Sequence, residues 1–245
     1  MILRNSQFSL LPEVVKNLLI INGLFFLGTW SLNESGIDLV KIFGLHQFQS
    51  KDFMPHQLIT HMFMHADLTH LFFNMFTLWM FGKNLENMWG PKRFLIYYLI
   101  TGFGAALIYI GYIQFQINNV SSLLNDNMIA QVMEANPGSH IYGTEEEVSL
   151  MGELWKLING PMLGASGAVY GLLLAYGFLF PNTMIYLYFA IPIKTKYFVI
   201  GIGLLALIDG MANNPGDNIA HFAHLGGMIF GLLILRLWKK QNNLY

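Results

Sequence analysis

The chain contains no cysteine among its 245 residues. This absence excludes disulfide bonds, a thiolate nucleophile and cysteine-ligated zinc, and it leaves the redox compartment unreadable. Charge is also scarce, because only 11% of the residues are charged whereas 54% are hydrophobic. Soluble domains average about 25% charged residues, so this chain cannot cover a water-facing surface in the usual way. The net charge of −1 offers no basic footprint, and no nucleic-acid partner is expected.

Long hydrophobic runs stand where the charges are missing. A helix that crosses a bilayer needs about 20 mostly apolar residues. Two uncharged runs meet this requirement, and four others are shorter or carry polar residues: 94–113 and 161–180, then 18–32, 68–82, 197–208 and 219–235. No convincing signal-peptide cleavage site follows the run 18–32, which is the first along the chain, so we interpret this run as a retained helix. The sequence therefore predicts an all-α polytopic membrane protein, a bundle of six transmembrane helices.

Lys and Arg predict the orientation, because these residues concentrate in cytoplasmic loops. Six helices place both termini on one side, together with the loops near 83–93 and 181–196. That side holds ten of the thirteen basic residues: Arg4, Lys16, Lys83, Lys92, Arg93, Lys194, Lys196, Arg236, Lys239 and Lys240. Only Lys41, Lys51 and Lys156 lie on the other, external side. We therefore expect both termini in the cytoplasm and a bacterial cytoplasmic membrane as the location.

Two external segments are long, at about 33–57 and 116–159. The first mixes apolar clusters with polar residues and could rest on the membrane surface. The second is polar and carries an acidic run at 145–147, which we interpret as a solvated face. A segment of this size has its own structure, serves a function or is disordered. The short apolar run 184–193 cannot span a bilayer and is expected at a membrane interface.

A serine between glycines is the first candidate for chemistry. Ser166 lies in the motif Gly164-Ala165-Ser166-Gly167, at the external start of the run from Pro161. Free N–H groups and the helix dipole at a helix start favour developing negative charge, as an oxyanion requires. Taken alone, such a serine is more often a packing residue, because small residues let membrane helices approach closely.

A histidine in the last run supplies a partner for this serine. His224 precedes Gly227 and Gly231 at spacings of three and seven, which place all three on one helix face. Gly167 and Gly171 form a matching pair on the serine run. Close approach of the two faces would let His224 take the hydroxyl proton and later return it to the leaving amine. Without Ser166, a histidine that only bonds another helix would be an equal reading.

No acidic residue completes a triad in the sequence, since nothing places Asp209 or Asp217 against the imidazole. A dyad is the simpler hypothesis. Tyr170 lies one turn beyond Ser166 on the same face, where its ring could pack on His224. An aromatic at this spacing is equally often an ordinary core residue.

His70 and Asn74 form a third polar element, four residues apart in the second run. Polar side chains within a membrane helix should face the bundle interior, and both can donate hydrogen bonds to an oxyanion. His61 and His65 repeat this spacing upstream. A zincin helix would need Glu where Met62 stands, so we expect no metal and assign both histidines to loop structure.

Together, and in this order, these motifs resemble the rhomboid family of intramembrane serine proteases, in its bacterial six-helix form. The resemblance covers residues 54–235 and implies one rhomboid-like domain over 1–245. It implies that Ser166 is the nucleophile and His224 the base, without a catalytic acid or a cofactor. It also implies that His70, Asn74 and the Ser166 N–H hold the oxyanion. The implied partners are the lipid bilayer and a transmembrane protein substrate.

Three further positions bear on the resemblance. Glu86 matches a family position that contributes to packing and loop hydrogen bonding. Many members carry Trp-Arg where this chain has His56 and Gln57, which leaves open how the first external loop is anchored. The 116–159 segment is longer than in minimal bacterial members.

Three functions remain in competition. The first is an endopeptidase that cuts transmembrane proteins near the external face, with a cavity open to that side and the run 197–208 as a mobile gate. The second is a catalytically silent relative that binds membrane clients, although a silent protein would be free to lose the serine, histidine and oxyanion donors. The third is a transporter or channel. A transporter would show corresponding broken helices in two halves, and the sequence shows none.

Overall fold

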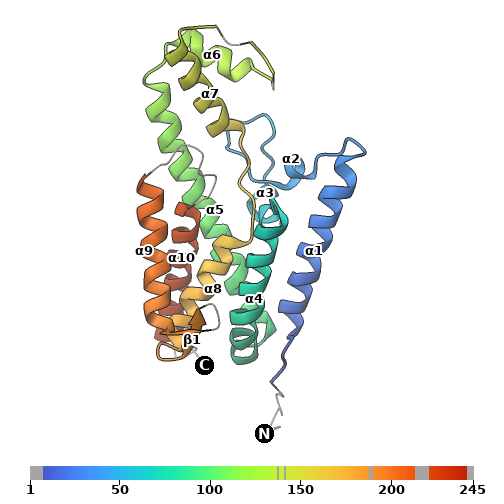
Figure 1. The fold of residues 1–245 in the computed structure, drawn as a ribbon, viewed down its shortest axis with the longest axis vertical. Helices are drawn as coiled ribbons and strands as arrows, with labels where there is room; N and C mark the ends of the chain where they lie inside the picture. The colour runs from blue at the N-terminus through green and yellow to red at the C-terminus, as the bar shows by residue number, and fades with distance from the viewer. Residues whose placement is uncertain (1–7, 137, 141, 188–189, 213–220, 242–245) are drawn as a thin grey trace.

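The computed structural model describes residues 8–136, 138–140, 142–187, 190–212 and 221–241. Within these residues, the bundle in Figure 1 is made of the helices α1 (Glu13–Asn33), α4 (Leu68–Trp89), α5 (Pro91–Ser121), α8 (Ser166–Leu179), α9 (Thr195–Ala212) and α10 (His221–Lys240). Short elements connect them: α2 (Leu39–Phe43), α3 (Gln57–Thr60), the 3₁₀ helix η1 (His61–Phe63), α6 (Asp126–Glu134), α7 (Glu145–Asn159), β1 (Met184–Leu187) and β2 (Ile191–Lys194).

The helices have the lengths and composition of a membrane protein. Four of the described helices, α1, α5, α9 and α10, are long and apolar enough to cross a bilayer. Helix α8 is apolar but has only 14 residues, and α4 has 22 residues with more polar ones among them. The all-α polytopic membrane fold is confirmed. In the described part of the chain, strand structure is limited to the antiparallel hairpin of β1 and β2, which occupies the short run at 184–193.

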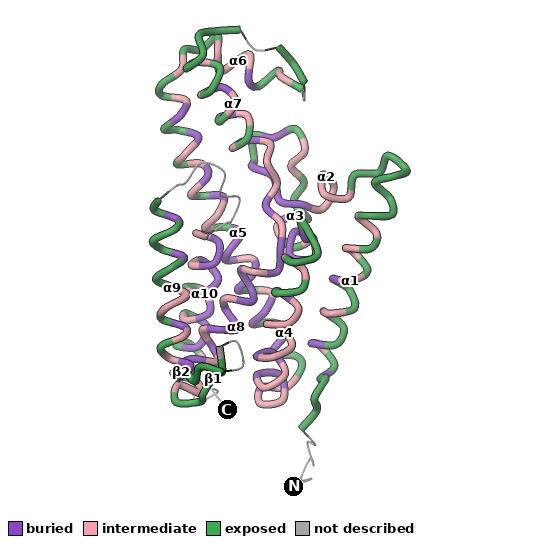
Figure 2. The backbone as a smooth tube through the Cα atoms, viewed as in Figure 1, coloured by how far each residue is buried: buried purple, intermediate pink, exposed green. Residues whose placement is uncertain are grey.

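The core of the bundle lies where α5, α8 and α10 pack together, and Figure 2 shows the buried residues gathering there. Large side chains such as Phe94, Tyr97, Leu172 and Leu235 are fully buried at this contact. Helix α1 lies at the edge of the bundle against α4 and exposes apolar side chains such as Trp30, as a helix facing lipid does.

Glu86 fixes the start of α1 from the end of α4. Its buried carboxylate accepts hydrogen bonds of 2.8 Å from the N–H groups of both Val14 and Val15. The first N–H groups of a helix have no partner inside the helix, and a carboxylate beside them also meets the positive end of the helix dipole. Glu86 therefore makes hydrogen bonds, as expected, and its partners are the backbone N–H groups at the start of α1.

The long segment after residue 116 has its own structure. Helix α5 continues to Ser121, and α6 and α7 fold back against its extension. We call α6, α7 and residues 113–121 the cap. It has a separate hydrophobic cluster, whose buried members are Ile113, Ile117, Val120, Val132, Met151, Leu154 and Ile158. Thr144 and Glu147 form a capping box at the start of α7, so part of the acidic run begins a helix.

The boundary of the serine run differs from the sequence expectation. Helix α8 begins at Ser166, not just after Pro161, because the preceding residues are not helical and Met162 pairs with Leu45 in an isolated β-bridge. Fourteen helical residues span about 21 Å, less than the ~30 Å of a hydrocarbon core. In Figure 1 the start of α8 lies below the upper ends of α5 and α9.

Candidate active site

Ser166 is the first residue of α8 and follows a backbone segment that only glycine adopts easily. Gly164 has φ of 115°, and its N–H donates to the His61 carbonyl at 2.9 Å. A Cβ at Gly164 would also lie 2.7 Å from Nε2 of His70. The loop therefore turns tightly beneath His70 and presents Ser166 at a helix start, where backbone N–H groups are free of helical partners.

His224 lies in the first turn of α10 and bonds directly to this serine. Its Nε2 is 2.8 Å from Oγ of Ser166. The imidazole is buried, and its Nδ1 has no hydrogen-bond partner among the described residues. If Nδ1 carries the proton, Nε2 is free to accept the serine hydroxyl, which is the arrangement a general base needs.

Two glycine faces allow this contact, as the spacing predicted. A Cβ at Gly227 would overlap the carbonyl oxygen of Gly167, and a Cβ at Gly231 would lie 3.5 Å from the Gly171 Cα. Helices α8 and α10 therefore meet backbone to backbone. Side chains of ordinary size would separate the helices and lengthen the bond between serine and histidine.

Tyr170 makes the ring contact that its spacing suggested. Its ring is parallel to the His224 imidazole, with the centroids 4.1 Å apart and the planes inclined by 6°. The ring of His221 stands 6.2 Å from that of His224 at 83°, and Asp217 lies outside the described residues. Nδ1 of His224 makes no hydrogen bond to a described carboxylate, and the stacked tyrosine ring is in direct contact with the imidazole.

His70 and Asn74 lie on α4, on the other side of the loop that carries Gly164. The Ala66 N–H points to Nδ1 of His70 over 3.5 Å, so Nδ1 accepts and the proton belongs on Nε2, beside Gly164. The amide nitrogen of Asn74, a buried residue, donates one bond to the His70 carbonyl at 3.0 Å and keeps a second N–H. Both side chains therefore have a donor to offer, and that of His70 lies beside the loop that leads into α8.

Replacing His70 or Asn74 by Ala is expected to lower kcat/KM by about 10²- to 10³-fold, the usual effect of removing one oxyanion donor. If the two residues act as oxyanion donors, the loss should fall mainly on kcat, because the charge on an oxyanion develops in the transition state. The measurement is cleavage of a reconstituted membrane substrate over a range of substrate concentrations.

Asn84 provides the matched control for Asn74. It lies on the same helix, and its amide donates to the Met80 carbonyl at 3.2 Å, the same bond to the residue four positions earlier. Asn84→Ala should therefore retain near wild-type cleavage. An equal loss in both variants would mean that Asn74 only supports the helix.

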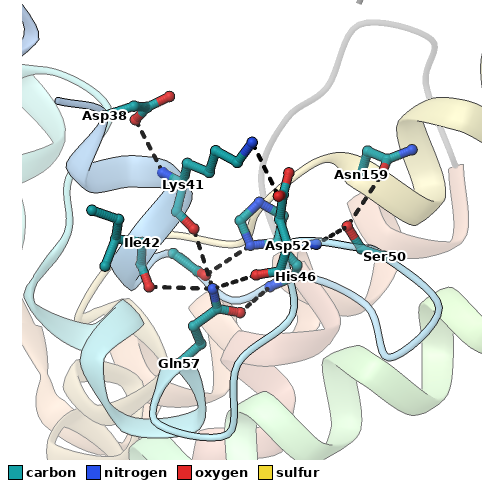
Figure 3. A network of polar contacts seen from close by, with 9 residues as sticks. Asp38, Lys41, Ile42, His46, Ser50, Asp52, Gln57 and Asn159 are labelled. Atoms are coloured by element: carbon teal, nitrogen blue, oxygen red, sulfur yellow. Dashed lines mark hydrogen bonds and ion pairs between the residues drawn. The ribbon is translucent and has the colours of Figure 1, made fainter. Parts of the chain in front are cut away.

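Gln57 holds the loop that precedes α4, and it answers the question of anchoring that the sequence had left open at this position. Its amide nitrogen donates toward the carbonyl oxygens of Lys41, Ile42 and Asp52, the last at 2.8 Å (Figure 3). Its carbonyl oxygen accepts from the N–H groups of His46 and Met54. A single fully buried amide therefore anchors the loop.

Neighbouring contacts tie this loop to the cap and to the segment before Ser166. Oγ of Ser50 donates to Asn159 at 3.1 Å, at the end of α7, and Lys41 pairs with Asp52 at 3.1 Å (Figure 3). Met162 pairs with Leu45 a few residues before the serine. The loop therefore braces the strand-like segment that leads into α8.

Replacing Gln57 by Leu is expected to destabilise the protein by about 3 kcal/mol or more. The change leaves several buried backbone groups without partners, and each unsatisfied group costs about 1–3 kcal/mol. Thermal unfolding in detergent measures the effect. Gln49→Leu is the matched control, because Gln49 is in the same loop and makes only an exposed bond to Gln114. Equal unfolding temperatures for the two variants would contradict the anchoring role.

His61 and His65 lie in the same loop region and are both buried. Nδ1 of His61 donates to the Gln57 carbonyl at 2.9 Å, so this residue serves loop structure. Burial lowers the pKa of His61 to about 4, and burial followed by repulsion from His70 lowers that of His65 to about 4. Both rings are therefore neutral near pH 7. Within the described ranges, no group of three or more His, Asp or Glu side chains is placed to hold a metal.

Comparison with known proteins agrees with this architecture. A family model described as the Rhomboid domain matches residues 52–241. RHOMBOID-like protein 12, mitochondrial, of Arabidopsis thaliana is 28% identical over 218 residues, which are 88% of this chain and 55% of that protein. Rhomboid protein 1, mitochondrial, of Saccharomyces cerevisiae is 27% identical over 223 residues, 90% of this chain and 52% of that protein.

A human relative, Presenilin-associated rhomboid-like protein, mitochondrial, is 26% identical over 190 residues, covering 74% of this chain and 39% of that protein. The chain thus spans about half the length, or less, of these relatives. Their names place them in mitochondria, which gives no support to the bacterial membrane expected from the sequence. The family model covers more than half of the chain, so this multi-pass membrane protein belongs to the rhomboid family, whose members are generally intramembrane serine proteases.

Proposed function

We propose that this chain is an intramembrane serine endopeptidase that cleaves transmembrane proteins near the external membrane face. The observation that carries the proposal is the 2.8 Å contact between Oγ of Ser166 and Nε2 of His224. A nucleophile within hydrogen-bond reach of a base, at a helix start that favours an oxyanion, is the arrangement required for acyl transfer.

In this mechanism His224 removes the hydroxyl proton as Oγ of Ser166 attacks the scissile carbonyl carbon. The oxyanion that forms is held by the Ser166 N–H, by Nε2–H of His70 and by the free amide N–H of Asn74. His224 then gives its proton to the leaving amine as the peptide bond breaks. Water, deprotonated by the same imidazole, hydrolyses the acyl-enzyme and restores the serine. Two groups thus perform both half-reactions.

The stacked ring of Tyr170 replaces the help that an acid gives in a triad. The imidazolium formed during attack has no carboxylate partner among the described residues. An aromatic face at 4.1 Å stabilises that cation and keeps the ring in plane. Gly164 and Gly167 support the site through the backbone, Gly164 by its turn under His70 and Gly167 by its contact with α10.

Substrate and water must reach Ser166 from different directions. Water enters from the side of the cap, where the polar site residues lie, and the substrate helix enters laterally from lipid. Helix α9 is our candidate gate, because it is the outermost helix on its side and exposes residues such as Ile200, Leu204 and Ile208. We treat residues 1–245 as one membrane domain with a core at 54–235.

The proposed orientation places both ends of the chain in the cytoplasm, and a bacterial cytoplasmic membrane remains our proposed location. Because the chain has no cysteine, single cysteines report orientation cleanly. An impermeant maleimide added outside intact cells should label Tyr142→Cys in the cap region and spare Ser9→Cys before α1. The reverse pattern would overturn the orientation.

The function is tested by reconstituting the purified full chain in vesicles with a generic transmembrane substrate. We expect cleavage at a peptide bond near the external end of the substrate helix, mapped by mass spectrometry. A fluorophosphonate probe should label Ser166 in the wild type and fail to label it in His224→Ala. Absence of both cleavage and labelling in well-folded protein would refute the protease and favour a silent client-binding relative.

A further inference from the structure

The hairpin of β1 and β2 connects two apolar helices of the bundle. It joins α8, which ends at Leu179, to α9, which begins at Thr195. Figure 1 shows it at the end of the bundle opposite the cap. Helix α9 leaves that point as a span whose apolar surface is largely exposed. A hairpin between two successive membrane helices lies where the chain leaves the hydrocarbon core, at or just beyond the headgroup region.

The two faces of the hairpin differ in what covers them. Ile185 pairs with Ile193, and Ile185 packs against the core of the bundle. On the opposite face Met184 pairs with Lys194 and Tyr186 with Pro192. These outward residues are exposed, Tyr186 to 60% and Met184 to 47%, so the protein itself leaves an apolar face uncovered.

The composition of this outward face matches the headgroup region of a bilayer. Tyrosine is enriched where membrane meets water, because its ring is apolar and its hydroxyl is polar. Lysine extends its apolar stem along lipid and places its charge among the headgroups. The bilayer is the one occupant that this protein is certain to meet at this level.

Charge narrows the occupant to lipids with an anionic headgroup. Lys194 and Lys196 flank the start of α9, and the sequence contains no Asp or Glu from residue 154 to 208. Among the described residues neither lysine forms an ion pair with a carboxylate. Two acidic side chains, Glu13 and Glu86, lie at the same end of the bundle as the hairpin. Glu86 already accepts hydrogen bonds from two backbone N–H groups.

We propose that the strands β1 and β2 form an interfacial anchor that seats Met184 and Tyr186 among the headgroups and binds anionic lipid phosphate through Lys194 and Lys196. The anchor acts on α9 directly. Thr195 donates to the Thr183 carbonyl from its N–H at 2.9 Å and from its hydroxyl at 2.7 Å, which ties the hairpin to the first turn of α9. Lipid bound at the hairpin thus fixes this end of the helix at one depth.

Single-cysteine labelling of the full chain tests the anchor without requiring proteolysis. A fluorophore on Tyr186→Cys, in phosphatidylcholine vesicles containing phosphatidylglycerol, should be quenched by a nitroxide on lipid headgroups and shielded from aqueous iodide. The same fluorophore on Tyr142→Cys, an exposed position near the cap, should show the reverse. Equal access of iodide to both positions would overturn the proposal.

A second readout tests the charge. Nitroxide-labelled phosphatidylglycerol should quench the label at position 186 more strongly than labelled phosphatidylcholine does. Lys194→Gln and Lys196→Gln should each lower this preference by up to about fivefold, since one lysine near a surface is worth about 1 kcal/mol. Lys51→Gln and Lys156→Gln, on the other side, should change nothing.

Folding and ligand source are checked in the same samples. The lysine variants count as folded if they unfold in detergent at the same temperature as the wild type. Inorganic phosphate in the buffer should leave the preference unchanged, and loss of the preference would assign the site to soluble phosphate instead. A preference that survives both lysine substitutions would refute the headgroup contact.

Discussion

Replacing Ser166 or His224 by Ala is expected to lower kcat/KM by about 10⁴-fold or more. Each change removes one member of a pair joined by a single 2.8 Å bond, so neither group has a substitute nearby. The measurement is single-turnover cleavage of a membrane substrate in vesicles. Stability should change far less, because one side-chain hydrogen bond contributes about 1 kcal/mol.

The double variant distinguishes a catalytic pair from two independent supports. Groups that act as a unit show grossly non-additive losses, so Ser166→Ala with His224→Ala should be no slower than the worse single variant. Ser122→Ala in the exposed turn after α5 is the control and should cleave like the wild type. Multiplicative losses in the double variant would contradict a dyad.

Replacing Gly227 by Ala is expected to lower activity by about 10²-fold or more and to destabilise the fold. The new methyl group would overlap the Gly167 carbonyl oxygen, so α8 and α10 must separate. Overpacking of this kind costs about 1–3 kcal/mol, and a misplacement of about 1 Å at reacting groups can cost 10²-fold in rate. Cleavage and thermal unfolding are measured on the same samples.

Gly201→Ala is the matched control, since it makes the same change inside α9. A Cβ at Gly201 meets nothing within 4 Å. Alanine is favoured over glycine in a helix by about 1 kcal/mol, so this variant should be as stable as the wild type or slightly more stable. If both glycine variants behave alike, the close approach of α8 and α10 does not set the geometry of the site.

The spacing of small and polar residues carried most of what the sequence could predict. Helical periodicity placed Gly227 and Gly231 on the same face of α10 as His224. It placed Gly167 and Gly171 together on one face of α8, and the two faces are in contact. It also placed Tyr170 against the imidazole. Such predictions succeed because a helix face depends only on local spacing. Long apolar runs predicted the membrane fold, because the length of such a run can also be read from consecutive residues alone.

Features that depend on tertiary contacts could not be predicted from the sequence. The run from Pro161 is apolar throughout, so hydrophobicity could not show that Met162 pairs with Leu45 and delays the helix to Ser166. The role of Gln57 arises from backbone groups brought together by the loop, and a lone glutamine gives no pattern to find. The short apolar run at 184–193 predicted a segment at the membrane interface, but nothing in its sequence predicted that it forms two paired strands.

The contact between Gly167 and Gly227 has a consequence for how this protein should fail on heating. Here main chain rests on main chain directly beside Ser166 and His224. The reacting pair is therefore as rigid as the packing of α8 on α10, which lies at the centre of the core. Inactivation should coincide with global unfolding, and a partly loosened, still folded but inactive state should not accumulate.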